Sequence, residues 1–327
     1  MGMTVALTGA TGFVGRRLCR ELLARGHKVR ALVRSRGRAM QVLPADPGLT
    51  LIGGEVSDAA RVGELLQGAG ACINLIGILS ERRGEAGGTF RAAHVDSVRS
   101  LVKGCEALGV GRFVQMSALG VSELGPAEYQ KTKFEGEQIV RRSSLAWTIF
   151  RPSLIHGSDG EFIQMCKAWA GGHAAPWLFM PYFRKTIEEK SVPLGPLYEM
   201  DPMVQPVAVE DVVTAFANAL ERDQTIGEVY NLVGGEALSF PDMLRHIRDH
   251  VHGANPDIEA HGIPGWLGAG VARAAALAGA GGLLPFDEGM ALMGAEDATG
   301  NAAKASAHLG IEFKAFRAAF EGYAGAV

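Results

Sequence analysis

The sequence predicts an α/β protein with a doubly wound parallel sheet and a smaller, mainly helical C-terminal lobe. Over the first 150 residues, short apolar runs alternate six times with segments whose apolar residues recur at helical spacing. Such alternation is typical of a parallel sheet with helices on both faces and right-handed crossovers. After Phe150 the alternation stops, and residues 156–205 are rich in Gly, Pro and aromatic side chains.

The expected strands are Thr4–Thr8, Lys28–Val33, Leu49–Ile52, Ala71–Leu75, Arg112–Met116 and Ala146–Phe150. The expected helices between them are Gly15–Arg25, Ala59–Leu66, Arg91–Leu108 and Ala127–Arg141. Two further short strands, Gln205–Val209 and Val229–Val233, flank an expected helix over Val212–Arg222. This division places residues 1–155 and about 205–235 in the sheet-containing core, and about 156–204 and 236–327 in the smaller lobe.

The composition of the 327 residues narrows the class of protein. The apolar share of 47% permits a large core, and the net charge of -3 is unlike that of nucleic-acid-binding proteins. The four cysteines are far apart in the sequence, so we interpret them as reduced, buried thiols and expect no metal site. The N-terminus has no signal-peptide pattern, which favours a cytoplasmic protein, at most peripheral to the inner membrane.

The Ala/Gly-rich run between Ile263 and Leu284 contains Arg273 and six glycines. These residues argue against a membrane span. A helical hairpin in the smaller lobe, a subunit contact and a membrane-surface contact all stay open for this segment.

The loop after the first expected strand, Thr8–Gly15, contains three glycines with the spacing GxxGxxG. Gly9 permits a tight turn, Gly12 lets the backbone approach a pyrophosphate, and Gly15 lets the next helix pack closely on the sheet. The helix N-terminus adds unpaired amide donors and a favourable dipole. Because the loop lies between an expected strand and an expected helix, it predicts a Rossmann-type dinucleotide site. Its candidate cofactor-binding residues are Gly9, Ala10, Thr11, Gly12, Phe13, Val14 and Gly15.

The end of the second expected strand bears on the choice of cofactor. Proteins that prefer NAD place an acidic residue there, to bind the adenosine ribose. This sequence has Arg34, Ser35, Arg36 and Arg38 instead. Because a guanidinium can pair with a 2′-phosphate, we expect NADP(H) to be preferred over NAD(H), with Arg34 and Ser35 as the contacts. Arg36 and Arg38 can equally belong to a solvated face.

These motifs resemble the short-chain dehydrogenase/reductase superfamily, in its extended or atypical branch. The likeness rests on TGATGFVG, on Gly54–Asp58 and on Tyr129-x-x-x-Lys133. A narrower likeness is to the subgroup that contains the NADPH-binding accessory subunit of respiratory complex I and its bacterial relatives, which are similar to NAD-dependent epimerases and dehydratases. It rests on Asn74–Leu79, Ser117–Gly120, Arg151–Gly157 and Gln205–Val212.

The resemblance implies a catalytic role for Tyr129, with Lys133 as its partner. Four residues apart on one helix, the two side chains project from the same face. The ammonium of Lys133 would stabilise the phenolate, lower the pKa of the tyrosine, and contact the nicotinamide ribose.

The sequence departs from this family in two places. Ala118 stands where the family has its catalytic Ser or Thr, and Ser117 is one residue earlier, so we keep Ser117 as the catalytic candidate. Because successive strand residues face opposite ways, Ser117 need not reach a substrate carbonyl. His94 replaces an Asn that extended members often carry; it can act in the site or be a buried histidine satisfied by backbone groups.

Further cofactor contacts are implied by position at the carboxyl ends of the strands. Glu55 and Val56 would lie beside the adenine. Leu75, Ile76 and Gly77 would line the dinucleotide after the fourth strand. Pro152 and Ile155 would approach the nicotinamide after the sixth.

Three functions remain open from the sequence alone. The first is an NAD(P)(H)-dependent oxidoreductase that acts on an apolar carbonyl or quinone-like compound, its pocket formed by the aromatic segment 156–205; those aromatic residues can equally pack the lobe. The second is a non-catalytic NADPH-binding accessory or assembly protein of a respiratory complex, in contact with a protein partner or a membrane surface. A sugar-nucleotide epimerase is a third, weakened by Ala118.

Overall fold

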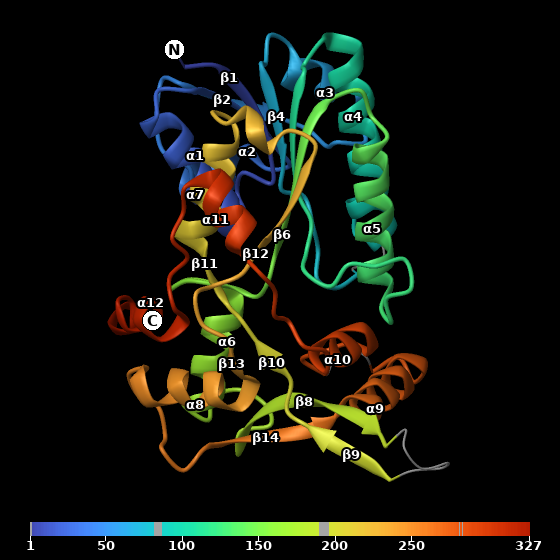
Figure 1. The fold of residues 1–327 in the computed structure, drawn as a ribbon, viewed down its shortest axis with the longest axis vertical. Helices are drawn as coiled ribbons and strands as arrows, with labels where there is room; N and C mark the ends of the chain where they lie inside the picture. The colour runs from blue at the N-terminus through green and yellow to red at the C-terminus, as the bar shows by residue number, and fades with distance from the viewer. Residues whose placement is uncertain (1, 82–86, 190–195, 281, 283) are drawn as a thin grey trace.

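The computed structural model describes the whole chain except residues 1, 82–86, 190–195, 281 and 283. Figure 1 shows a sheet-containing core that holds the N-terminus and a smaller lobe at the other end of the molecule. The C-terminus lies beside that lobe.

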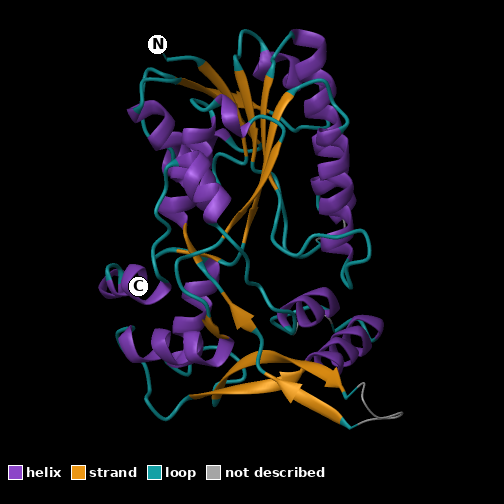
Figure 2. Ribbon diagram, in the orientation of Figure 1, coloured by secondary structure: helices purple, strands orange, loops and turns teal. Residues whose placement is uncertain are grey.

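A seven-stranded sheet forms the centre of the core (Figure 2). Its strands are β1 (Thr4–Thr8), β2 (Lys28–Val33), β3 (Leu49–Gly53), β4 (Ala71–Asn74), β5 (Arg112–Met116), β6 (Ala146–Pro152) and β12 (Glu228–Leu232). Their order is β12-β6-β5-β4-β1-β2-β3, and every neighbouring pair is parallel. The predicted doubly wound fold is confirmed.

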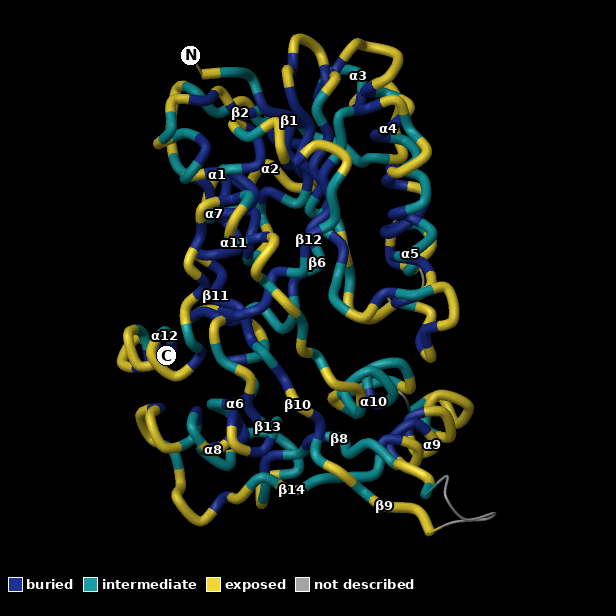
Figure 3. Tube along the Cα trace, viewed as in Figure 1, coloured by how far each residue is buried: buried dark blue, intermediate teal, exposed yellow. Residues whose placement is uncertain are grey.

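Helices cover both faces of this sheet. The helices α1 (Phe13–Ala24), α2 (Arg36–Val42), α7 (Val209–Ala219) and α11 (Ala303–Leu309) share one core cluster, and α3 (Ala59–Leu66), α4 (Ser97–Leu108) and α5 (Glu128–Arg141) share the other. Strand β1 shows why two clusters form: Val5 and Leu7 point into the first, and Ala6 into the second. Figure 3 shows the buried strands between these helices.

The end of the chain differs from the predicted division. Leu309, Ile311 and Phe313 are buried in the cluster that contains Val212 and Phe216. Residues about 302–313 therefore return to the sheet-containing core, although the sequence placed all of 236–327 in the lobe. The segment is a single short helix and carries no strand–helix alternation, so the sequence pattern could not indicate which part it joins.

The smaller lobe contains the helices α6 (Glu161–Ala170), α8 (Phe240–His250), α9 (Gly265–Leu277), α10 (Glu288–Gly294) and α12 (Phe316–Glu321). It also contains a three-stranded sheet of order β14-β8-β9, which the sequence analysis did not anticipate. Its strands are β8 (Phe179–Glu188), β9 (Leu197–Met200) and β14 (Glu259–Pro264). Pro181 and Gly262 lie inside these strands, and both residue types are uncommon there, which hid the strands from the sequence pattern.

The remaining elements are short. They are η1 (Ala92–Asp96), β7 (Ile155–His156), β10 (Met203–Val204), β11 (Val207–Ala208), η2 (Asp223–Thr225), β13 (Leu238–Ser239) and η4 (Ala324–Ala326). β7 pairs with β11, and β10 pairs with β13.

Two expectations about composition can be compared with the structure. The four cysteines are all unpaired and buried, as predicted. In the Ala/Gly-rich run, α9 packs against α10, so the segment contributes to a pair of helices in the lobe. Within the described part of the chain, no helix has the length and apolar character needed to cross a membrane.

Gly136 allows α5 to approach η1 closely. A Cβ at this position would lie 2.3 Å from the carbonyl oxygen of His94. In contrast, a Cβ on Gly63, in helix α3, would meet nothing within 4 Å. We expect Gly136→Ala to lower the free energy of unfolding by about 1–3 kcal/mol, because the two elements must separate. Gly63→Ala, the matched control, should raise it by about 0.5–1 kcal/mol. Urea denaturation measures both; equal effects of the two substitutions would contradict the prediction.

Candidate functional site

A cavity of about 410 Å³ opens at the carboxyl ends of β1, β2, β3 and β4. The strand order reverses between β4 and β1, and ligands of open α/β sheets bind at this kind of point. The wall comes from the loops that follow these four strands and from the start of the η1–α4 segment. The cavity therefore lies where the glycine loop predicts it.

The three glycines of the loop bring the first helix onto the end of the first strand. Gly9 has φ +71°, and a Cβ there would lie 3.0 Å from the backbone of Leu75. The Gly12 amide donates a hydrogen bond to the Gly9 carbonyl, at 3.0 Å. A Cβ on Gly15 would lie 2.1 Å from the same carbonyl oxygen. A side chain on Gly9 or Gly15 would clash with the nearby backbone. The loop therefore leaves its backbone atoms open to a bound ligand.

The N-terminus of α1 suits an anion. Gly12 caps the helix and has no side chain to occupy the first amides, and the first turn carries no acidic residue. The amides and the helix dipole can therefore stabilise a pyrophosphate. Arg16 and Arg17 flank this turn, but both form ion pairs with Asp159.

The candidate residues of the loop divide into two groups. Gly9, Thr11 and Gly12 line the cavity. Ala10 and Val14 are buried in the core cluster, so only their backbone atoms can face a ligand. The ring of Phe13 packs against Gly157 and Gly160, away from the loop itself.

At the end of β2, Arg34 lines the cavity and is exposed. Its guanidinium forms no hydrogen bond or ion pair with any residue that the structure describes. Ser35 instead caps α2, where its hydroxyl accepts from the Arg38 amide at 3.3 Å. Arg36 is tied to β3, because it donates to the Leu51 carbonyl at 3.3 Å. Arg34 is thus the arginine of this group that faces the cavity.

The loops after β3 and β4 supply the opposite wall. Glu55 and Val56 line the cavity on one side, and Leu75, Ile76 and Gly77 on the other. Part of the wall was missed by the sequence analysis: Ala92, Ala93, Asp96 and Ser97 also line it. The first three belong to a π-helical turn, η1, and Ser97 follows it, in a region where the sequence predicted one regular helix. A turn of that kind leaves no periodic signal.

Tyr129 and Lys133 lie together on α5, next to the cavity. The Lys133 ammonium is 5.4 Å from the centre of the Tyr129 ring. It also lies 3.2 Å from where a Cβ on Gly77 would stand, and Gly77 belongs to the cavity wall. His94 and Phe90 enclose the tyrosine ring in edge-to-face contacts, with ring centres 5.2 and 5.9 Å away.

Burial determines the charge states of this pair. It raises the pKa of Tyr129, and Lys133 is not among the resolved causes, whereas the sequence analysis expected Lys133 to lower this pKa. Burial also lowers the pKa of Lys133 from 10.5 to about 8, although the Glu137 carboxylate acts in the opposite direction. For Lys133, desolvation outweighs the attraction of Glu137, because the ammonium lies away from water, whereas the half-buried Tyr129 is affected by desolvation alone.

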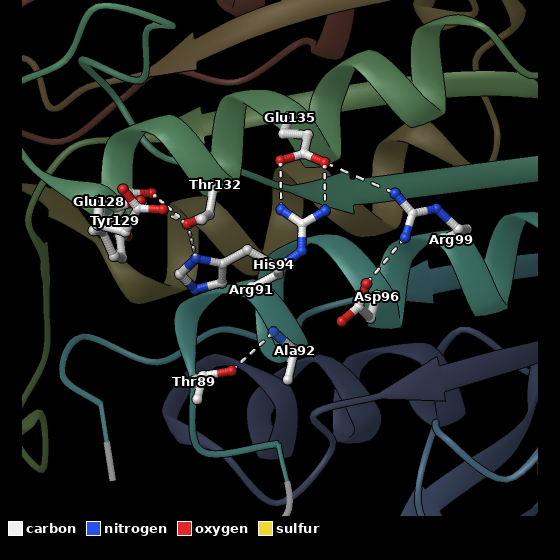
Figure 4. A network of polar contacts seen from close by, with 10 residues as sticks. All are labelled: Thr89, Arg91, Ala92, His94, Asp96, Arg99, Glu128, Tyr129, Thr132 and Glu135. Atoms are coloured by element: carbon white, nitrogen blue, oxygen red, sulfur yellow. Dashed lines mark hydrogen bonds and ion pairs between the residues drawn. The ribbon is translucent and has the colours of Figure 1, made fainter. Parts of the chain in front are cut away.

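One ring nitrogen of His94 has a backbone partner and the other has a side-chain partner, Thr132, whose contact is drawn in Figure 4. Its Nε2 accepts from the Ile78 amide at 3.3 Å, so Nδ1 carries the proton and donates to the Thr132 hydroxyl at 3.0 Å. Burial, and then Lys133, lower the pKa of His94 to about 2. The histidine is therefore neutral, and it ties the loop after β4 to helix α5.

The remaining candidates lie at the ends of β5 and β6. The Ser117 hydroxyl is buried and has no hydrogen-bond partner in the described part of the chain, whereas Ala118 is half-buried. Pro152 ends β6, and Ile155 begins β7. Ser117, Pro152 and Ile155 are not in the cavity wall, and neither are Tyr129 and Lys133.

The part of the chain that contains the glycine loop and α5 is similar to known proteins. Residues 9–166 match a family described as NAD(P)H-binding. A relative from Dictyostelium discoideum, subunit 9 of the NADH dehydrogenase (ubiquinone) 1 alpha subcomplex, is 24% identical over 251 residues, 76% of this chain and 64% of the relative. Ceramide reductase from Caulobacter vibrioides is 30% identical over 175 residues, 53% of each protein. The chain thus spans about half to two thirds of these relatives.

A solved structure supports the fold. It is a short-chain dehydrogenase/reductase superfamily protein from Agrobacterium tumefaciens with bound NAD. Its TM-score is 0.65 at 20% identity, over 98% of this chain and 95% of that one.

The fold and the cavity define an NAD(P)H-binding Rossmann-type protein. Its fold is that of the solved short-chain dehydrogenase/reductase superfamily protein, and its sequence is similar to a ceramide reductase and to a subunit of NADH dehydrogenase.

The lowered pKa of Lys133 has a consequence for stability. At pH 7 the amine is protonated in both the folded and the unfolded chain, and burying that charge costs about 3 kcal/mol. Between pH 8 and 10.5 only the folded chain loses the proton, so the cost falls as the pH rises and disappears above 10.5. We expect Lys133→Met to raise the free energy of unfolding at pH 7 and to have little effect near pH 10.5.

Urea denaturation of the protein without added nucleotide measures this difference. Lys131→Met is the matched control, because Lys131 is exposed on the same helix. Destabilisation by Lys133→Met at pH 7 would show that the buried charge is not a cost.

Proposed function

We propose that this protein is an NADPH-dependent reductase of an apolar carbonyl compound. The observation on which the proposal rests is the Tyr129–Lys133 pair beside the dinucleotide cavity, with Lys133 against the Gly77 wall. When bound, NADPH supplies a hydride to the carbonyl carbon. The carbonyl oxygen then needs a proton, which Tyr129 donates in this proposal.

The protonation state of Tyr129 supports the reductive direction. Because burial raises its pKa, the phenol keeps its proton at neutral pH and acts as a donor. The Lys133 ammonium lies near enough to stabilise the phenolate that remains. The unpaired hydroxyl of Ser117 can donate to the substrate oxygen only if the two come within hydrogen-bond reach.

We also propose that NADPH is preferred over NADH. The support is the exposed guanidinium of Arg34 on the cavity wall, in a position where an acidic residue would repel a 2′-phosphate.

Arg34→Ala should raise the Kd of NADPH about 10–100-fold, since a charge-assisted hydrogen bond contributes about 1.5–3 kcal/mol. The Kd of NADH should change little. Fluorescence titration measures both values. The matched control is Arg38→Ala, because Arg38 is exposed on α2 but is not in the cavity wall. Equal or tighter binding of NADH by the unmodified protein would contradict the NADPH preference.

Tyr129→Phe should reduce turnover about 10²–10⁴-fold and leave NADPH affinity unchanged, because only the proton donor is lost. NADPH oxidation in the presence of ketones, aldehydes and quinones measures turnover. Tyr198→Phe, at an exposed tyrosine in β9, is the control. Turnover that survives Tyr129→Phe would overturn the role of this residue.

A second function is favoured by one feature of the lobe. Helix α9 exposes Trp266 and Leu277, at 61% and 84%, together with Leu267 and Val271. Large apolar side chains gathered on one helix are typical of a surface that contacts a partner. An accessory protein of a respiratory complex, like the subunit to which the chain is similar, would bind NADPH tightly and turn over none of the compounds.

A further inference from the structure

Helices α8 and α12 bring three side chains with metal-binding atoms together in the smaller lobe. His246 and His250 are four residues apart on α8, so they share one face of the helix. Glu321 is the last residue of α12. One ligand atom from each of the three residues lies within 4.8 Å of the others.

The two imidazoles present their Nε2 atoms to this point. The Nδ1 atom of His250 lies 2.8 Å from the backbone carbonyl of His246 and donates to it, so Nε2 carries a lone pair. The Nε2 atom of His246 is buried and has no hydrogen-bond partner among the described residues. A hydrogen bond on the far nitrogen orients histidine ligands in the same way at known metal sites.

The carboxylate of Glu321 faces both nitrogens at ion-pair distance, without a hydrogen bond to either. Its Oε1 lies 3.7 Å from Nε2 of His246 and 3.8 Å from Nε2 of His250, beyond hydrogen-bond distance. A lone pair that faces a carboxylate oxygen is repelled by it, and a cation between them removes the repulsion. Ligand atoms around tetrahedral Zn²⁺ lie roughly 3.4 Å apart, so the Glu321 oxygen needs to move by only a few tenths of an ångström. The two Nε2 atoms lie within 4.8 Å of each other and have to approach to the same distance.

The surroundings make one ligand rigid and leave two accessible. The His246 ring packs edge-on against Phe316 and Phe320, with ring centres 5.9 and 5.8 Å apart. His250 and Glu321 are exposed, so an ion can enter from solvent and Glu321 can adjust its position.

We propose that His246, His250 and Glu321 form a binding site for a divalent transition metal, for which Zn²⁺ is the natural probe. Two imidazole nitrogens and one carboxylate oxygen suit this ion, and water completes a tetrahedral set. The metal would fasten α12 to α8. The sequence analysis expected no metal because it considered cysteines, although the His246–His250 spacing is visible in the sequence.

Calorimetric titration of the metal-stripped full-length chain with Zn²⁺ tests the proposal. We expect one saturable site with a Kd in the micromolar range or below, and a Co²⁺ complex with the absorption bands of tetrahedral coordination. His250→Gln and Glu321→Gln should each weaken Zn²⁺ binding by more than about 100-fold, since even partners outside the ligand set contribute 10–100-fold. His252→Gln, at an exposed histidine two residues from His250, should bind like the unmodified chain.

Two further measurements separate metal binding from misfolding. Zn²⁺ should raise the Tm of the unmodified chain and of His252→Gln, but not of the two site variants. NADPH affinity should be the same in all four proteins, because the nucleotide cavity lies at the strand ends of the core. Binding only at millimolar Zn²⁺, or equal Zn²⁺ affinity in the unmodified chain and His250→Gln, would overturn the proposal.

Discussion

The approach of Gly15 to the Gly9 carbonyl is the contact on which the nucleotide cavity depends. A Cβ on Gly15 would stand 2.1 Å from that oxygen, so only glycine lets α1 begin so close to the end of β1. The same contact directs the first amides of α1 at the cavity. Gly9 adds a positive φ and sits against the backbone of Leu75, which fixes the loop after β4 as the opposite wall. The close approach of Gly15 to Gly9 thus accounts both for the packing of α1 and for a site that can bind phosphate.

The buried ammonium of Lys133 connects the cavity wall with the catalytic candidates on α5. Lys133 is buried beside the wall at Gly77. Glu137, one turn further along α5, is fully buried and accepts two hydrogen bonds from Arg151, at 2.7 and 2.6 Å. The carboxylate makes the Lys133 ammonium less unfavourable than burial alone would. Even so, a buried ammonium of this kind lowers the stability of the fold.

Much of the fold follows from local sequence patterns. The strands β1, β2 and β5 have the predicted bounds, because each is an apolar run between a helix end and a turn. The lobe sheet was missed since Pro181, Gly262 and Pro264 break the strand pattern, and its pairing joins residues about 80 positions apart. Similarly, Ala92 and Asp96 reach the cavity through a π-helical turn that the helical spacing does not reveal.

The chemistry of the candidate site also divides into features that the sequence pattern predicts and features that it does not. A glycine loop or a Tyr-x-x-x-Lys spacing identifies residues that lie together: Gly9 and Gly12 line the cavity, and Tyr129 and Lys133 are neighbours on α5 outside its wall. Charge state depends on solvent exposure, which the sequence does not contain. For this reason, attraction to Lys133 was expected to lower the pKa of Tyr129, whereas burial raises it. Desolvation therefore favours the protonated form of the Tyr129 phenol in this site.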